Sequence, residues 1–198
     1  MEASAAAPTA WSPRADWTEP LRARPIGTAF GCAVMIALLT WRVGPHAALP
    51  AFLYLGVVGV ALAVVDVALK RLPDPLTLPS YAIGAVLLAA AAPFTGDGGA
   101  RLVHALIGMA ALWALFAVQW FLLPSAIGLG DVKLAGVLGL YLGWLGADAW
   151  LLGVFATFVT GGLVAVALLV TRRAGRGSEL PYGPFMLLGT LIAVLVHA

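Results

Sequence analysis

Charged side chains are scarce in this sequence. Lys, Arg, Asp and Glu together make up 10% of its 198 residues, whereas hydrophobic residues make up 62%. The mean hydropathy is +1.01, and soluble domains are typically about 25% charged. This scarcity excludes a soluble globular domain and predicts an integral membrane protein, with the lipid bilayer as its first partner.

Cysteine is also nearly absent. The one cysteine, Cys32, falls in the middle of an apolar segment, which excludes a disulfide framework and a CxxC zinc site. Metal sites need clustered ligands, and we expect neither a metal nor a cofactor. The net charge is +2, but the basic residues cluster between apolar runs, where they act as topology signals. No nucleic-acid partner is expected.

Seven apolar segments approach the roughly 20 residues that a helix needs to cross a bilayer. Residues rich in Pro, Gly and polar side chains separate them. We therefore predict an all-α polytopic membrane helical bundle of about seven transmembrane helices. Residues 1–25 are expected to form a flexible cytoplasmic tail. The segments are residues 26–43, 47–69, 77–93, 102–123, 131–147, 149–171 and 183–197.

The positive charges indicate an orientation. In a seven-crossing topology most of them fall on one side, and only Arg42 and Arg101 fall on the other. Cytoplasmic loops carry the excess of Lys and Arg, so the N-terminus is predicted in the cytoplasm and the C-terminus outside a bacterial inner membrane. The residues on the cytoplasmic side are Arg14, Arg22, Arg24, Lys70, Arg71, Lys133, Arg172, Arg173 and Arg176.

Two aspartates lie at membrane depth. Asp66 is near the cytoplasmic end of the second segment, and Asp131 opens the fifth segment after Gly128-Leu129-Gly130. Two crossings separate them, so both are predicted at the cytoplasmic face, where they can meet. Ionisable residues inside a bilayer are costly and usually functional. These two carboxylates are therefore the candidate catalytic residues.

Structural roles for the same residues stay open. Asp131 can act as a helix N-cap after a glycine turn, and Asp66 can pair with Lys70 at i,i+4. Lys133 is either a supporting residue of the site or a positive anchor at the membrane face. Asp74 lies in a proline-flanked turn, where aspartate commonly bonds its own backbone.

Paired carboxylates suit the hydrolysis of a peptide bond. One must be ionised to take a proton from water, and the other must be protonated to polarise the carbonyl. Two close carboxylates cannot easily both ionise, so they share a proton and titrate as a pair. Gly128 and Gly130 are expected to allow close backbone approach and the positive φ that the turn before Asp131 requires.

Glycines recur on the two helices that carry the aspartates. Gly136, Gly139 and Gly143 follow Asp131, and Gly56 and Gly59 precede Asp66. Small residues allow close packing of membrane helices, so these glycines predict close packing between the two helices. The alternative is that they only reflect a composition rich in Gly and Ala.

Three blocks around these residues resemble the prepilin peptidases, a family of membrane aspartyl proteases. Asp66 followed by Leu72-Pro73-Asp74-Pro75-Leu76-Thr77 is similar to their first aspartate region. Gly128-Leu129-Gly130-Asp131-Val132-Lys133-Leu134 looks like their GxGD motif. Pro181-Tyr182-Gly183-Pro184-Phe185 is similar to a block near their C-terminus.

The resemblance implies a six-helix peptidase core over residues 47–197, preceded by an additional membrane helix at 26–43. It implies cleavage of the leader peptide of type IV prepilins or pseudopilins at the cytoplasmic boundary, in pilus assembly or protein secretion. Larger members carry paired cysteines in a cytoplasmic segment, which this chain does not have. It therefore resembles the smaller forms. Leader cleavage carries over better than N-methylation.

Two other functions remain as alternatives. One is another GxGD intramembrane protease, related to presenilin or signal peptide peptidase. In those enzymes the first aspartate follows Tyr, whereas Val65 precedes Asp66 here. The other is a transporter or assembly subunit whose carboxylates carry protons or organise helices. Transporters commonly show internal repeats, and no convincing repeat is found in this sequence.

Overall fold

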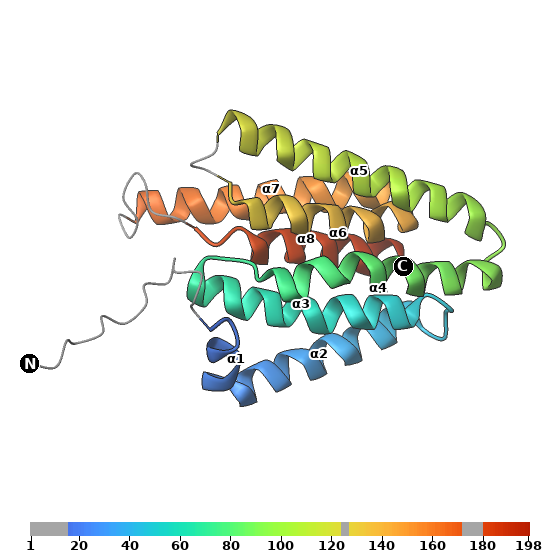
Figure 1. Cartoon of the computed structure of the whole chain (residues 1–198), viewed down its shortest axis with the longest axis horizontal. Coiled ribbons are helices and arrows are strands. Elements are labelled where there is room, and N and C mark those ends of the chain that lie inside the picture. The colour runs from blue at the N-terminus through green and yellow to red at the C-terminus, as the bar shows by residue number, and fades with distance from the viewer. Residues whose placement is uncertain (1–15, 124–126, 172–179) are drawn as a thin grey trace, which may run out of the picture.

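The computed structural model describes residues 16–123, 127–171 and 180–198. These residues fold into helices and contain no strand, as the sequence predicted. The long helices run side by side along the molecule (Figure 1). In chain order the elements are α1 (Glu19–Ala23), α2 (Pro25–Val43), α3 (Leu49–Leu69), α4 (Asp74–Ala91) with the 3-10 turn η1 (Ala92–Phe94), α5 (Gly98–Leu122), α6 (Leu129–Leu145), α7 (Ala147–Val170) and α8 (Gly183–His197).

Each predicted apolar segment corresponds to one helix from α2 to α8. Proline lies in the first turn of α2, α3, α4 and α8, where its missing N–H breaks no helical hydrogen bond. The largest differences from the predicted starts are at α4 and α5, which begin at Asp74 and Gly98. Within the predicted tail, residues 19–23 form α1, and residues 1–15 lie outside the described part of the chain.

The number of membrane crossings agrees approximately with the prediction. Five helices are long and apolar enough to cross a bilayer, namely α2, α3, α4 with η1, α5 and α7. Helices α6 and α8 have 17 and 15 residues. At 1.5 Å per residue α6 is about 26 Å long, slightly less than the roughly 30 Å of a hydrocarbon core.

Helix α6 is the centre of the bundle. It packs against α4, α5, α7 and α8, and twelve of its 17 residues are buried. Its glycine face meets α5, because a Cβ atom at Gly139 would collide with the carbonyl oxygen of Gly108, and one at Gly143 with that of His104. Backbones approach this closely only where side chains are absent.

The predicted packing between the two aspartate-bearing helices through their glycines is therefore wrong. Gly139 and Gly143 face α5, not α3. On α3, Gly56 contacts Leu39 of α2, and Gly59 contacts Leu187 of α8. Small residues show that two helices approach closely, but they do not identify the partner.

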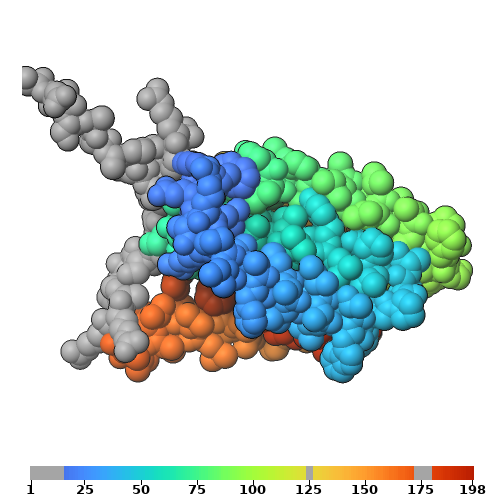
Figure 2. All heavy atoms as spheres, turned by 90° about the horizontal axis from the view of Figure 1, so that it is seen from below, coloured from blue at the N-terminus to red at the C-terminus, as the bar shows by residue number. Residues whose placement is uncertain are grey.

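Helix α2 lies on the outside of the bundle. Leu39 is its one buried residue, and α2 packs mainly along α3. Figure 2, which shows the molecule from this side, has α1 and α2 on the outer surface. Near the end of α2, Arg42 donates hydrogen bonds to the carbonyl oxygens of Leu195 (2.5 Å), Val196 (2.8 Å) and Ala198. These contacts satisfy free carbonyls at the end of α8.

The up-and-down order of the helices brings the end of α3 and the starts of α4, α6 and α8 to one end of the bundle (Figure 1). We call this the aspartate end, because it contains Asp66 and Asp131. Arg42 and Arg101 lie at the opposite end, on α2 and α5. Arg14, Arg172, Arg173 and Arg176 of the predicted cytoplasmic set lie outside the described residues.

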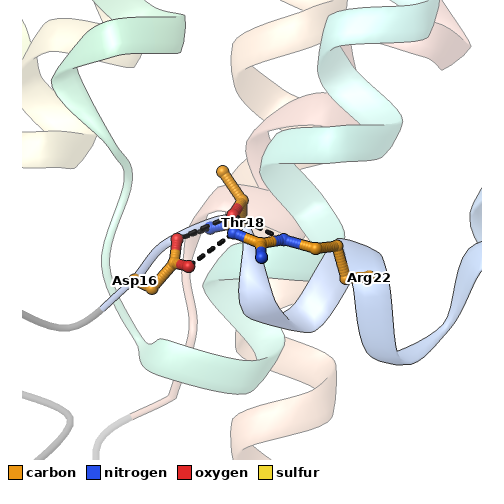
Figure 3. A network of polar contacts seen from close by, with 3 residues as sticks. All are labelled: Asp16, Thr18 and Arg22. Atoms are coloured by element: carbon orange, nitrogen blue, oxygen red, sulfur yellow. Dashed lines mark hydrogen bonds and ion pairs between the residues drawn. The ribbon is translucent and has the colours of Figure 1, made fainter.

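Helix α1 begins with a small polar network at its exposed start. Arg22 Nη2 lies 2.6 Å from Asp16 Oδ2, and the backbone N–H of Thr18 donates to Asp16 Oδ1 at 2.9 Å (Figure 3). The hydrogen bond from the Thr18 hydroxyl is the main cause that lowers the pKa of Asp16 below its ordinary value. Exposed pairs of this kind contribute little to stability, so the network fixes only the local start of α1.

Candidate active site

Asp66 lies in the last turn of α3 and is buried, with 3% of its surface exposed. Its Oδ2 accepts a hydrogen bond of 3.0 Å from the backbone N–H of Gly183, the first residue of α8. The proposed pairing with Lys70 is not formed, because Lys70 contacts Asp66 only through the backbone, with its N–H donating to the Asp66 carbonyl at 2.8 Å. The buried carboxylate of Asp66 therefore faces the start of α8 and not the side chain of Lys70.

Asp131 is the third residue of α6 and is partly exposed. Its Oδ2 accepts a hydrogen bond of 3.1 Å from the backbone N–H of Gly128. Gly128 is the N-cap residue, so the interpretation of Asp131 as the N-cap was wrong by three positions. The carboxylate instead reaches back to the cap, as the acidic residue of a capping box does.

The two carboxylates are close enough to act on each other. The charge of Asp131 contributes to the electrostatic environment of Asp66, although α4 and α5 separate the two helices in the chain. Tyr182, directly before α8, also lies near Asp131. Burial raises the pKa of the Tyr182 phenol to about 12, and the charge of Asp131 is the second cause.

Leu72 fills the space between the starts of α6 and α8. Its side chain is 8% exposed. A Cβ atom at Gly130 would lie 3.0 Å from Leu72 Cβ, and one at Gly183 would lie 3.3 Å from Leu72 Cδ2. The loop between α3 and α4 thus contacts the residue before Asp131 and the residue that donates to Asp66.

The expected positive φ in the glycine turn is not found. Gly128 has a φ of −81°, and among the described glycines only Gly44 and Gly146 have positive φ. A Cβ atom at Gly128 would lie 3.4 Å from Asp131 Oδ2, which is ordinary contact. The close approach to Leu72 explains the glycine at position 130, whereas neither sterics nor φ requires one at 128.

Lys133 and Asp74 form an ion pair at the aspartate end. Lys133 Nζ lies 2.7 Å from Asp74 Oδ1, and the two side chains are 33% and 53% exposed. The Tyr81 hydroxyl donates to the Lys133 carbonyl at 2.6 Å. Asp74 therefore contacts another helix as well as opening α4. Lys133 joins the starts of α4 and α6 two residues after Asp131.

Tyr182 packs into an aromatic cluster. Its ring centroid lies 6.1 Å from that of Phe116 on α5, 6.4 Å from Phe158 on α7 and 6.2 Å from Phe185 on α8. A Cβ atom at Gly161 would lie 3.1 Å from the ring. The first turn of α8 is therefore held by two other helices, α5 and α7, next to the carboxylates. The family resemblance of Pro181 to Phe185 does not by itself indicate this packing role.

The described residues contain no group of three or more His, Cys, Asp and Glu side chains that could hold a metal ion.

The sequence matches the type IV leader peptidase family over residues 51–166, which is more than half of the chain and includes both aspartates. The chain belongs to the type IV leader peptidase family. The matched range ends within α7, so the first turn of α8 lies outside it.

Individual members of the family show moderate similarity. A protein from Pseudomonas putida named prepilin leader peptidase/N-methyltransferase is 29% identical over 168 residues, which cover 83% of this chain and 56% of that protein. A protein of the same name from Aeromonas hydrophila is 31% identical over 137 residues, 69% of this chain and 46% of that protein. A protein of the same name from Neisseria gonorrhoeae is 29% identical over 157 residues, which cover 76% of this chain and 50% of that protein.

This leader peptidase family member spans about half the length of the curated relatives it matches. No solved structure matches it.

Proposed function

We propose that the protein is a membrane aspartyl endopeptidase that cleaves the leader peptide of type IV prepilins or pseudopilins, with Asp66 and Asp131 as the catalytic pair. One observation supports this most strongly. The two carboxylates come from helices that are distant in the chain, yet both lie at one small site: Gly183 donates to Asp66, and Leu72 contacts both Gly183 and Gly130, the residue before Asp131. Each is oriented by a backbone N–H, from Gly183 and from Gly128.

The pair divides the work of hydrolysis. An ionised carboxylate takes a proton from water as the water attacks the peptide carbonyl, and the protonated partner donates a hydrogen bond to the carbonyl oxygen. Close carboxylates reach this state because one shared proton relieves their repulsion. When the bond breaks, the partner gives its proton to the leaving nitrogen. The two residues then exchange roles in the next cycle.

The topology supports the type of substrate. In the proposed orientation the aspartate end faces the cytoplasm, because Lys70, Arg71 and Lys133 lie there and Arg42 and Arg101 lie opposite. A prepilin-type substrate has a polar leader followed by an apolar helix, as the family resemblance implies. Its apolar helix would lie in the bilayer, and its leader junction would then meet carboxylates at the membrane boundary.

The proposal is confined to cleavage. The relatives' printed names also include N-methyltransferase, but the chain covers only 56% and 46% of the two relatives from Pseudomonas putida and Aeromonas hydrophila. Leader cleavage needs only groups that are present at the aspartate end.

The test is cleavage of a co-expressed prepilin in membranes by the wild type, Asp66→Asn and Asp131→Asn. Asparagine keeps the shape of the side chain and its acceptor oxygen but removes the acid, so we expect each variant to lose at least about 1,000-fold in activity. Asp97→Asn is the matched control, because Asp97 pairs with Arg101 at the other end of the bundle. Wild-type cleavage by either site variant would refute the pair.

A further inference from the structure

The first residue of α8 lies directly against Asp66 and Leu72. Gly183 is buried, and its N–H donates to Asp66 Oδ2 at 3.0 Å. A Cβ atom there would lie 2.8 Å from the same oxygen and 3.3 Å from Leu72 Cδ2. Any other residue at this position would push the Asp66 carboxylate away from its donor.

Leu72 also contacts the start of α6. A Cβ atom at Gly130, the residue before Asp131, would lie 3.0 Å from Leu72 Cβ. Leu72 therefore separates the start of α6 from the start of α8. A shorter side chain would let the two helix starts move together and would change the spacing of the carboxylates.

We propose that Gly183 and Leu72 are positioning residues for the aspartate pair. The N–H of Gly183 fixes the rotamer of Asp66, and the side chain of Leu72 sets the distance between the start of α6, which carries Asp131, and the start of α8, whose N–H binds Asp66. The inference rests on the proposed peptidase function. Neither residue contacts the substrate in this role, so both act through the aspartates.

The donor is held rigidly enough for this role. Tyr182 and Phe185 on either side of Gly183 pack in the aromatic cluster with Phe158. One turn further along α8, a Cβ atom at Gly189 would collide with Thr157 of α7, so the two helices lie in close contact. Helix α8 thus cannot shift to accept a side chain at position 183 without breaking its contact with α7.

The first experiment compares purified wild type and Gly183→Ala with a prepilin substrate. We expect kcat to fall about 100-fold, because small misplacements of a catalytic group have effects of this size. KM should stay within about twofold, since substrate contacts are unchanged. Gly162→Ala is the matched control, because a Cβ atom at Gly162 meets nothing within 4 Å. Wild-type kcat for Gly183→Ala would overturn the inference.

The pH profile separates positioning from loss of folded protein. An N–H donor favours the ionised carboxylate, so displacing it should move the acidic limb of the kcat profile of Gly183→Ala to higher pH. A smaller folded fraction would lower kcat at every pH and leave the limb in place. An unmoved limb would therefore overturn the role of the Gly183 N–H, even if activity is low.

Leu72 provides the second test. Leu72→Ala should lower kcat about tenfold with KM nearly unchanged, whereas Leu78→Ala, at a residue 50% exposed on α4, should not. The double variant Gly183→Ala/Leu72→Ala should remain as inactive as Gly183→Ala, because the contact with Asp66 Oδ2 persists. Restored activity would mean that glycine is needed only for packing against Leu72.

Failure of this inference differs from failure of the proposed function. If the wild type does not cleave the prepilin, or if Asp66→Asn cleaves it normally, the peptidase proposal fails. If the wild type is active, Asp66→Asn is inactive and Gly183→Ala behaves as wild type, only the positioning role fails.

Discussion

The two aspartates are held in opposite ways. Asp131 receives its hydrogen bond from Gly128, three residues earlier in the turn that opens α6. Asp66 receives its hydrogen bond from Gly183, 117 residues later in the chain. Asp131 is partly exposed, whereas Asp66 is buried. One carboxylate is oriented by its own helix start and the other by the packing of a distant helix.

The orientations of the two carboxylates therefore depend on different parts of the fold. The orientation of Asp131 needs only a helix that begins at Gly128, and capping geometry supplies this locally. The orientation of Asp66 needs α8 to remain in place against α3 and α7. Variants that disturb helix packing should therefore act on Asp66 through α8, and variants in the glycine turn should act on Asp131.

The largest expected effect tests whether the contact with α5 stabilises α6, the helix that carries Asp131. Gly139→Leu puts a side chain where α5 and α6 touch, because even a Cβ atom would collide with the Gly108 carbonyl oxygen. We expect the free energy of unfolding to fall by about 3 kcal/mol, measured by thermal unfolding in detergent. Gly162→Leu is the control. An unchanged melting temperature would show that α6 does not need its contact with α5.

A smaller effect is expected in the turn itself. Gly130→Ala should lower cleavage about tenfold, because its Cβ atom would press on Leu72 at 3.0 Å and shift the start of α6. Gly128→Ala should lower it no more than about twofold, since its φ is −81° and alanine keeps the N–H that binds Asp131. Measured rates in the reverse order would contradict the steric explanation of the GxGD turn.

The smallest effect is expected at the ion pair between Lys133 and Asp74, which joins the starts of α6 and α4. Lys133 and Asp74 are 33% and 53% exposed, and exposed pairs contribute about 0–1 kcal/mol. Lys133→Met and Asp74→Asn should each change stability by less than about 1 kcal/mol, with a coupling energy that decreases in salt. A double-mutant coupling above about 2 kcal/mol would mean that the pair holds α4 against α6.

Much of the architecture could be predicted from the sequence. The seven apolar segments correspond to α2 through α8, because long apolar runs and their proline and glycine breaks are strong signals. Counting the crossings between Asp66 and Asp131 was enough to place both at one end. The glycine turn before Asp131 also indicated a helix start, although the N-cap is Gly128.

The remaining features depend on long-range packing. Helices α2 and α6 are both apolar, yet Leu39 is the one buried residue of α2, whereas twelve residues of α6 are buried. Lipid accepts an apolar side chain as readily as another helix does, so hydropathy cannot separate a central helix from a peripheral one. The roles of Gly183 and Leu72 were hidden for the same reason, because they arise only where three distant segments meet.

The hydrogen bond between Gly183 and Asp66 also has a consequence for biosynthesis. Ribosomes make the chain from its N-terminus, so both aspartates are translated before the donor, which lies 117 residues after Asp66. A nascent chain that has inserted α3 and α6 has both acids but not the group that orients the first. The Asp66 carboxylate therefore has no donor from Gly183 until α8 has been made and has packed against α3.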